Sequence, residues 1–528
     1  MSKKILITDP IESSCIEILQ SAGFEVNHKP GLKEDEIISI INDYNVLVLR
    51  SETKVTKKII DSSSNLELLA RAGAGVDNID VNAATHRGII VMNTPGGNTL
   101  STAEHTMALL LSMCRNIPTA NYELKQGLWD RKKYLGTELF GKKIGVIGLG
   151  KIGKEVAIRC KAFGMEVLGY DPVLTQDAAQ KIGVRLVSID EIFEQSDIIT
   201  VHVPLSNETK NLIDKKAISK CKDGVKIINC ARGGIVNEEA LLEGLKSGKV
   251  SAAALDVFEK EPPQFPNELI EHPKVVVTPH IGASTKEAQE KVAVQIANQI
   301  IDFYKNGNLI GAVNAYALEK NLTDEIRPFI ELAKTLGKFF SQISQENINN
   351  IELKFHGSLL QKFRETLTSA FLIGYLSKKI TGTINFVNAQ LLAEETGIKI
   401  IESNELEHET YKNLFTASSY ATAEIITLSG TIFGKNDIRI VRVNDYSMDI
   451  HPTKYMLLYE NIDKPGMLAA VGSILAKNQI NIAGLSLGRK EIGGKALTLM
   501  NLDSKLATQI IDDIKLIDGI GKVLVIEI

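Results

Sequence analysis

Residues 142–171 have the sequence KKIGVIGLGKIGKEVAIRCKAFGMEVLGYD. The apolar run KKIGVIG predicts a strand that leads directly into Gly148, Gly150 and Gly153. The next residues, KEVAIRCKAFG, have helical spacing, and EVLGYD predicts a second strand that ends at Asp171. This order of strand, tight turn, helix and strand predicts a doubly wound α/β unit that binds a dinucleotide.

The three glycines and the aspartate have separate physical purposes. Gly148 permits the sharp turn, Gly150 lets the backbone approach a pyrophosphate, and Gly153 lets the helix and strand pack closely. Free N–H groups and the positive end of the helix dipole then face the anion. Asp171 can accept hydrogen bonds from a ribose 2′-hydroxyl and would repel a 2′-phosphate. The stretch therefore predicts NAD, rather than NADP, as the cofactor.

Length and composition set the class of protein. A chain of 528 residues has room for about three or four domains. Its net charge of −4 gives no basic footprint for nucleic acid or an anionic membrane. Its five cysteines show no CxxC pair and no metal-type spacing, which is typical of a reducing compartment. The N-terminus lacks a signal-peptide core, so we expect a cytoplasmic protein. From the charge and the cysteine spacing we expect no metal site, no nucleic-acid partner and no membrane partner.

Residues 1–97 alternate between short strand-like and helix-like runs, which predicts a small parallel sheet with helices on both faces. Ligands of such sheets lie beyond the carboxyl ends of the strands. Arg50 and Ser51 follow one predicted strand, and Arg71 and Gly73 follow another. Two arginines at the ends of adjacent strands predict an anion pocket.

Four polar residues follow predicted strands between 142 and 282. Arg232 ends VKIINCAR, Asp256 lies near the end of SAAALDVF, Glu261 is in the next loop, and His280 ends VVVTPH. We expect all four at the sheet edge where the glycine turn places the cofactor.

This set of residues favours hydride transfer to or from a hydroxyl-bearing carboxylic acid. The planar fork of Arg232 can hold a carboxylate in two hydrogen bonds. Histidine titrates near neutral pH, so His280 can take the hydroxyl proton or return it. Glu261 would hold the imidazole ring and favour its protonated form.

The second half of the chain predicts two further domains. Residues 315–453 predict an α+β segment with strands at 348–357, 423–434 and 437–444. From Lys454 the order is βαββαβ, the ferredoxin-like arrangement. The predicted domains are a substrate-binding domain (1–97 with 284–314), an NAD-binding domain (98–283), an intervening regulatory domain (315–453) and a C-terminal domain (454–528).

With these residues in view, the chain resembles the D-2-hydroxy-acid dehydrogenase family. The matching runs are RAGAGVDNID, NTPGGNTLSTAEHT, GVIGLGKIG, SDIITVHVPL, INCARGG, ALDVFEKEP and TPHIGAS, which together span about residues 70 to 285. The whole chain is similar to the longer form of the family, which carries an intervening domain and a terminal ACT domain. The resemblance implies NAD-dependent oxidation of 3-phosphoglycerate to 3-phosphohydroxypyruvate, the first step of L-serine biosynthesis, in a homotetramer.

The resemblance also implies roles for individual residues. The catalytic residues would be Arg232, Glu261 and His280. Beside the turn glycines, cofactor contacts would come from Lys151, Ile152, Asp171, Val203, Cys230, Ala231, Arg232, Asp256, His280, Gly282 and Ala283. Substrate contacts would come from Arg50, Ser51, Arg71, Gly73 and Arg232, with Arg131 reaching the phosphate in a neighbouring subunit. Serine would bind between subunits, as a feedback inhibitor, at Asn461, Asp463 and Asn481.

Two other functions fit the same fold. The first is reduction of unphosphorylated glyoxylate or hydroxypyruvate, and the arginines beyond Arg232 argue against it because a lone carboxylate needs fewer cations. The second is a non-catalytic protein that senses NADH. The terminal amino-acid-binding domain and the lack of a basic arm argue against that function.

Overall fold

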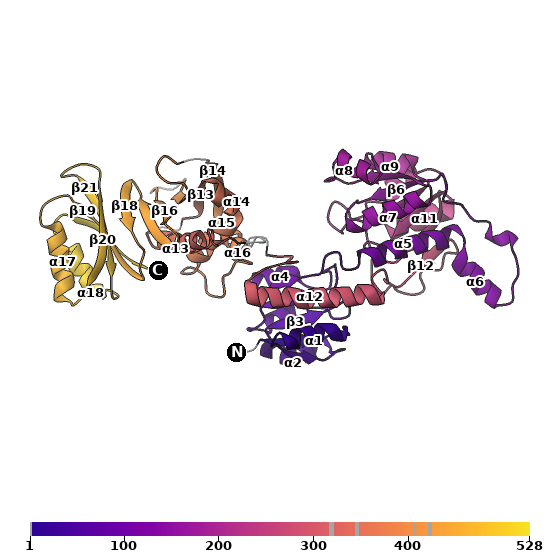
Figure 1. Ribbon diagram of the computed structural model, residues 1–528, viewed down its shortest axis with the longest axis horizontal. Coiled ribbons are helices and arrows are strands. Elements are labelled where there is room, and N and C mark those ends of the chain that lie inside the picture. The colour runs from indigo at the N-terminus through magenta and orange to yellow at the C-terminus, as the bar shows by residue number, and fades with distance from the viewer. Residues whose placement is uncertain (1–2, 316–321, 344–347, 406–407, 421–424) are drawn as a thin grey trace.

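The computed structural model describes residues 3–315, 322–343, 348–405, 408–420 and 425–528. Within them, four β-sheets follow one another along the chain (Figure 1). The first two are parallel, the third is mixed and the fourth is antiparallel. This arrangement confirms the predicted fold class of two doubly wound α/β sheets, an α+β segment and a ferredoxin-like unit.

The first sheet has the strand order β2-β1-β3-β4-β5. Every residue of β3 is buried, as expected for a strand covered on both faces. The strands are β1 (Lys4–Ile7), β2 (Glu25–His28), β3 (Val46–Leu49), β4 (Leu68–Arg71) and β5 (Ile90–Met92). The helices are α1 (Ser13–Ser21), α2 (Glu34–Ile40), η1 (Ile41–Asp43), α3 (Lys57–Asp61) and α4 (Val81–His86).

The second sheet has the order β12-β11-β10-β9-β6-β7-β8, so the strand order reverses between β6 and β9. Ligands of open α/β sheets bind at this switch point. The strands are β6 (Lys143–Ile147), β7 (Glu166–Tyr170), β8 (Arg185–Leu186), β9 (Ile198–Val201), β10 (Val225–Asn229), β11 (Val250–Leu255) and β12 (Val275–Val277). The helices are α5 (Thr99–Cys114), α6 (Ile117–Lys125), η2 (Lys132–Tyr134), α7 (Lys151–Ala162), α8 (Gln176–Lys181), α9 (Ile189–Gln195), α10 (Lys215–Lys220) and α11 (Glu238–Ser247).

Helix α12 (Lys286–Asn306) leads from the second sheet back to the first (Figure 1). Thr285 caps its N-terminus, and Gly307 ends it in the left-handed conformation. Val292, Ala293 and Ile296 are buried in the core of the first sheet. The chain therefore crosses between the sheets twice, once before α5 and once in α12.

The third sheet has the order β14-β13-β15-β16-β17-β18. Strands at 348–357 and 437–444 were predicted, as was one at 423–434, whose first two residues lie outside the described residues; β14, β15 and β18 were not predicted. The strands are β13 (Asn350–His356), β14 (Lys399–Glu405), β15 (Leu414–Ser419), β16 (Thr427–Phe433), β17 (Asp437–Val443) and β18 (Tyr446–Ile450). The helices are α13 (Arg327–Ile343), α14 (Ser358–Lys362), α15 (Arg364–Leu376) and α16 (Ala389–Glu395).

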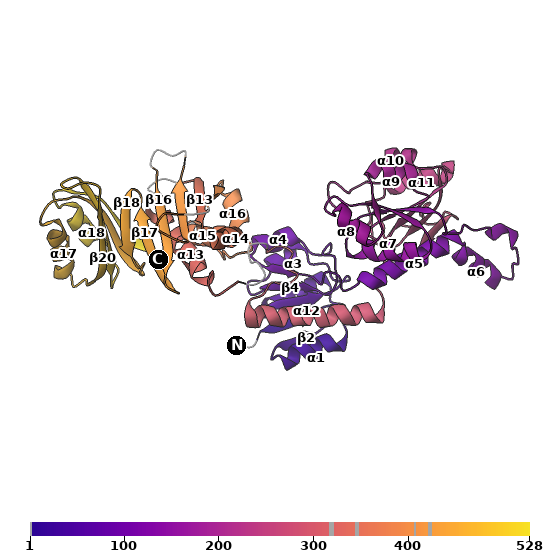
Figure 2. The same cartoon turned by 45° about the horizontal axis from the view of Figure 1, so that its top comes forward.

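The fourth sheet has the order β20-β21-β19-β22. Helices α17 (Met467–Lys477) and α18 (Thr508–Lys515) pack on one of its faces. Residues of the other face, including Met456 and Leu499, share one hydrophobic core with α13 and the third sheet (Figure 2). The strands are β19 (Tyr455–Ile462), β20 (Ile482–Arg489), β21 (Lys495–Leu502) and β22 (Ile520–Glu527).

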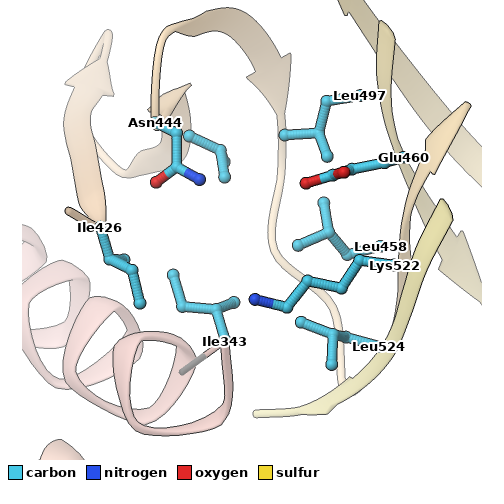
Figure 3. A pocket seen from close by; sticks show the side chains of 9 residues that line it. Ile343, Ile426, Asn444, Leu458, Glu460, Leu497, Lys522 and Leu524 are labelled. Atoms are coloured by element: carbon cyan, nitrogen blue, oxygen red, sulfur yellow. The ribbon is translucent and has the colours of Figure 1, made fainter. Parts of the chain in front are cut away.

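A small cavity lies in the boundary between the third and fourth sheets (Figure 3). Its walls include Ile343 of α13, Asn444 after β17, and Glu460 and Lys522 of the fourth sheet. Its volume of about 20 Å³ is enough for a single water molecule. The two sheets therefore pack closely, with no room there for a metabolite.

The described residues contain no helix with the length and apolar character needed to cross a membrane. They also contain no cluster of three or more histidine, cysteine or carboxylate side chains arranged to hold a metal ion. All five cysteines are buried thiols.

Candidate active site at the carboxyl ends of the two parallel sheets

The glycine turn follows β6 at the switch point of the second sheet. Gly148 has a φ of +90°, and a Cβ there would lie 2.7 Å from Cγ1 of Val203. A Cβ on Gly153 would collide with the carbonyl oxygen of Gly148. Gly150 faces open space, with no atom within 4 Å of its Cβ position. These positions permit the turn, the close packing of α7 and the approach of a ligand to the backbone.

The end of β7 places Asp171 beside this turn. Its carboxylate accepts hydrogen bonds from the backbone N–H of Leu149 (2.8 Å), Val173 (2.9 Å) and Leu174 (3.0 Å). Burial alone would raise the pKa of Asp171. The three hydrogen bonds lower it by more, so the pKa of Asp171 is below its ordinary value. An ionised carboxylate has about four acceptor positions, so one remains for a ribose hydroxyl.

His280 lies after β12 and is paired with Glu261. His280 Nδ1 lies 2.6 Å from Glu261 Oε2, and the other oxygen of Glu261 accepts from Phe258 N–H at 3.1 Å. The backbone of His280 has a φ of +53°, which is uncommon for a residue with a side chain and is typical of functional sites. Burial raises the pKa of Glu261, but the hydrogen bonds from His280 and Phe258 outweigh it and lower the pKa. Nε2 of the ring is thus left to exchange a proton with a ligand.

Asp256 holds the loop that carries His280. It is only 1% exposed, and its carboxylate accepts from Thr278 Oγ1, Ile281 N and Gly282 N at 2.6, 2.9 and 2.8 Å. His105 Nε2 lies 3.2 Å from the same carboxylate. Burial raises the pKa of Asp256, whereas the hydrogen bonds from His105, Thr278 and Ile281 bring it below its ordinary value. Because the protein occupies both oxygens, direct contact between Asp256 and a cofactor stays a prediction.

Arg232 lies in the loop after β10. The side chain of Asn229 holds this loop by donating to Arg232 O at 2.8 Å and accepting from Ala231 N at 3.0 Å. The guanidinium donates from Nε to Asp77 Oδ2 at 3.0 Å and from Nη1 to Ala231 O at 2.7 Å. Cys230 is buried, and burial raises the pKa of its thiol to about 12. The loop therefore offers a cation and no reactive thiolate.

The first sheet supplies two more arginines. Asp9 holds the loop after β3 by accepting from Arg50 N at 2.6 Å, which leaves Ser51 exposed beside it. Arg71 at the end of β4 donates from Nε to Arg50 O at 3.2 Å. Among the described residues, the buried Nη1 of Arg71 has no hydrogen-bond partner. Gly73 N–H turns back onto Arg71 O at 2.9 Å, so the strand end is tightly folded.

The structure does not bring Arg131 to this site. It is an exposed residue in the loop after α6, which projects from the second sheet on the side away from the first sheet (Figure 1). A role for Arg131 in substrate binding therefore requires a second copy of the chain, and it stays a prediction.

One of the three predicted regulatory residues, Asn481, lies away from the other two. Asn461 is 5% exposed, accepts from Thr498 Oγ1 and donates to the backbone. Asp463 follows the last residue of β19 and accepts from Arg489 Nη1 at 2.8 Å. Asn481 precedes β20. The first residues of β19 and β20 both pair with Leu502 of β21, so Asn481 lies near the start of β19. Asp463 and Asn481 therefore lie at opposite ends of the sheet, so a ligand touching both would need two chains.

Sequence reasoning left three polar residues of the site without a role. Asp77 lies within the run RAGAGVDNID, but nothing in that run indicates that its side chain pairs with Arg232 of the other sheet. Asn229 ends β10 and Asp9 follows β1, and both hold loops that carry arginines. A polar residue at the carboxyl end of a buried parallel strand is the signal that could have identified these two.

Three domain families match the sequence. The NAD-binding domain of D-isomer specific 2-hydroxyacid dehydrogenases matches residues 107–282. The D-3-phosphoglycerate dehydrogenase intervening domain matches residues 325–444, and the ACT domain matches residues 455–515. These matches fall on the second, third and fourth sheets in turn, with β18 and β22 beyond the matched residues.

Comparisons with individual proteins agree with these domain matches. D-3-phosphoglycerate dehydrogenase of Archaeoglobus fulgidus is 43% identical over 519 residues, with 98% of each chain covered. The Bacillus subtilis enzyme of that name is 41% identical over 518 residues, covering 98% of this chain and 96% of the relative. A glyoxylate reductase from Paecilomyes thermophila has a similar structure, with a TM-score of 0.54, 30% identity, and coverage of 59% of this chain and 98% of that one.

The two parallel sheets and the matched NAD-binding domain define an oxidoreductase that uses a nicotinamide dinucleotide. Because similar structures also include a D-lactate dehydrogenase of Aquifex aeolicus with NAD and lactic acid, the fold alone does not select the substrate. The full-length relatives are more specific. The chain belongs to the D-3-phosphoglycerate dehydrogenases of the D-isomer specific 2-hydroxyacid dehydrogenase family.

Proposed function

We propose that this chain catalyses the NAD-dependent oxidation of 3-phospho-D-glycerate to 3-phosphohydroxypyruvate, the first step of L-serine biosynthesis. The observation that carries the substrate assignment is the group of three arginines at the facing ends of the two sheets. Arg232 pairs with a loop of the first sheet, and Arg71 contacts the loop of Arg50. A single carboxylate needs one guanidinium, whereas a second anionic group such as a phosphate uses the others.

The buried Nη1 of Arg71 supports a ligand on that side. Burial lowers the pKa of Arg71, and the nearby charge of Asp77 opposes this effect. A buried guanidinium nitrogen without a partner is costly unless a ligand supplies the acceptor. The phosphate of the substrate is a suitable acceptor because it has several anionic oxygens.

The proposed chemistry follows from the arrangement of three side chains. Arg232 binds the carboxylate and orients the carbon that carries the hydroxyl group. Nε2 of His280 removes the hydroxyl proton, while the carboxylate at Nδ1 stabilises the imidazolium that forms. When bound, the dinucleotide supplies the acceptor for the hydride from that carbon. In the reverse direction His280 returns the proton to the carbonyl oxygen.

The residues near the glycine turn fit NAD better than NADP. The α7 N-terminus and the open position at Gly150 suit a pyrophosphate. The pKa of Asp171 is lowered, so its carboxylate is ionised and would repel a 2′-phosphate. Lys151, Ile152, Val203 and the 280–283 loop complete the proposed cofactor contacts.

We further propose that serine binds at the ACT domain and inhibits the enzyme in a homotetramer. Asp463 is the proposed acceptor for the amino group, and its pKa is lowered, first by the hydrogen bond from Arg489. Arg489 and the backbone N–H of Gly493 both donate to Oδ2 of Asp463, so the amino group of serine would compete with them or bind Oδ1. Asn481 would come from the adjoining subunit, because it lies at the other end of the sheet.

Replacing Arg50 tests the substrate assignment. Arg50→Ala should raise KM for 3-phosphoglycerate by roughly 10-fold or more, as expected for loss of a charged hydrogen bond, and should change KM for unphosphorylated D-glycerate much less. Arg87→Ala is a matched control, since Arg87 donates to Ser63 O in the same domain, away from the site. Equal losses with both substrates would contradict the assignment of the phosphate to this pocket.

A further inference from the structure

Asp77 forms the contact between the loop after β4 and the loop after β10. Its Oδ2 accepts from Arg232 Nε at 3.0 Å. The two residues are 155 positions apart in the chain and belong to different sheets. The side chain of Asp77 is 64% exposed and that of Arg232 is 30% exposed, so the pair is partly open to solvent.

The contacts of Arg232 leave a defined set of donors for a ligand. A guanidinium carries five N–H donors. Asp77 takes the donor on Nε, and Ala231 O takes one on Nη1. The remaining Nη1 donor and both Nη2 donors form the end of the fork, which can bind a carboxylate in two hydrogen bonds.

Gly75 shows where that end of the fork points. A Cβ on Gly75 would lie 2.7 Å from Asp77 Oδ2, 2.8 Å from Arg71 Nη1 and closer still to Arg232 Nη2. Two guanidinium groups and one carboxylate therefore meet over the backbone of Gly75. The two positively charged guanidinium groups repel each other, and the Asp77 carboxylate beside them offsets that repulsion.

The backbone next to Asp77 is held firmly. The side-chain amide of Asn78 donates to Arg50 O at 2.7 Å and to Thr53 O at 2.6 Å. Asp77 is thereby tied to the loop that carries Arg50. A contact from Asp77 to Arg232 consequently sets the position of Arg232 relative to the arginines of the first sheet.

We infer that Asp77 is a positioning residue for Arg232. It holds Nε so that the Nη end of the fork faces the substrate carboxylate, and it keeps Arg232 and Arg71 together before the substrate binds. This inference rests on the proposed function, in which Arg232 binds the carboxylate. It makes Asp77 a determinant of substrate affinity that does not itself touch the substrate.

The test combines single and double substitutions in the full-length enzyme. Asp77→Ala should raise KM for 3-phosphoglycerate by roughly 5-fold, because the pair is partly open to solvent and its interaction is screened. Asp77→Asn, which keeps an oxygen acceptor for Nε, should give a smaller rise. NADH affinity, measured by fluorescence titration, should stay within about twofold of wild type, because the glycine turn is untouched.

The double variant separates positioning from general loss of structure. In an Arg232→Ala background, Asp77→Ala should have almost no additional effect on kcat/KM, since the interaction is already gone. Asp35→Ala, an exposed acidic residue of α2 in the same domain, is the matched control.

A KM unchanged or lowered by Asp77→Ala would overturn the inference, as would a full additional loss in the Arg232→Ala background. If Asp77→Ala does not fold, Asp77→Asn decides the question by the same criteria. A wild type that prefers an unphosphorylated hydroxy acid would overturn the proposed substrate instead, and the same comparison would then be made with that acid.

Discussion

Replacing Glu261 with glutamine should slow the oxidation by roughly 10-fold. The glutamine side chain has nearly the same shape and can still accept from Phe258 N–H at the 3.1 Å contact. What it removes is the negative charge 2.6 Å from His280 Nδ1. The pKa of Glu261 is lowered by His280 and Phe258 despite burial, so this charge is present throughout the neutral range.

The size of the effect follows from the exposure of the pair. Two charges about 4 Å apart interact by about 1 kcal/mol in water and about 4 kcal/mol near a protein surface. The side chains of His280 and Glu261 are 46% and 36% exposed, so solvent screening favours the lower figure. About 1 to 1.5 kcal/mol corresponds to a rate change of roughly 10-fold. Because the carboxylate stabilises the imidazolium that forms when His280 takes the substrate proton, its removal raises the barrier by about this amount.

The assay is the initial rate of NADH formation from 3-phosphoglycerate between pH 6 and 10, with the oxo acid trapped as it forms. In the Glu261→Gln variant kcat/KM should fall by roughly 10-fold or more, because the imidazolium is less stabilised and the ring is less well oriented. His280→Asn, which lacks the base, should lose about 10²- to 10⁴-fold in kcat at every pH. A Glu261→Gln variant with the kcat/KM of the wild type would refute the proposed pairing.

Two other outcomes follow from the structure. Burial lowers the pKa of His202 to about 4. The stability that its neutral ring contributes is therefore complete above about pH 6.5 and declines as the pH falls toward 4. His202→Phe should flatten this part of the plot of melting temperature against pH. A profile with the same slope in both proteins would rule out His202 as the cause. Asp463→Ala should abolish inhibition by serine while leaving the uninhibited rate near normal. Arg489→Ala, which removes the competing cation from that carboxylate, should lower the serine concentration for half-inhibition. Unchanged serine titrations in both variants would place the inhibitor elsewhere.

The first half of the fold could be predicted from sequence because its signals are local. Buried strands such as VLVL (46–49) and the glycine turn after β6 each identify their own element. Parallel sheets also gather strand ends at one edge, so the meeting of Glu261 and His280 could be expected from their positions in the sequence.

Other features depend on contacts between distant segments. The strand β14 has the sequence KIIESNE, with polar residues on most positions, and forms by parallel pairing with β13. The pairing of Asp77 with Arg232 requires the relative placement of two sheets, which no periodicity encodes. Likewise Asn461 turns inward to Thr498 because of the register between β19 and β21. Local patterns therefore located the site but not the residues that hold its parts together.

In the proposed complex, the arginines of the first sheet bind the phosphate of a hydroxy acid whose carboxylate is held by Arg232. The most direct test compares 3-phosphoglycerate with unphosphorylated D-glycerate, with NAD in excess and the product removed. A phosphate held by charged hydrogen bonds should give a preference in kcat/KM of roughly 100-fold or more for the phosphorylated acid. An equal or reversed preference would keep the hydride chemistry and contradict the assigned substrate.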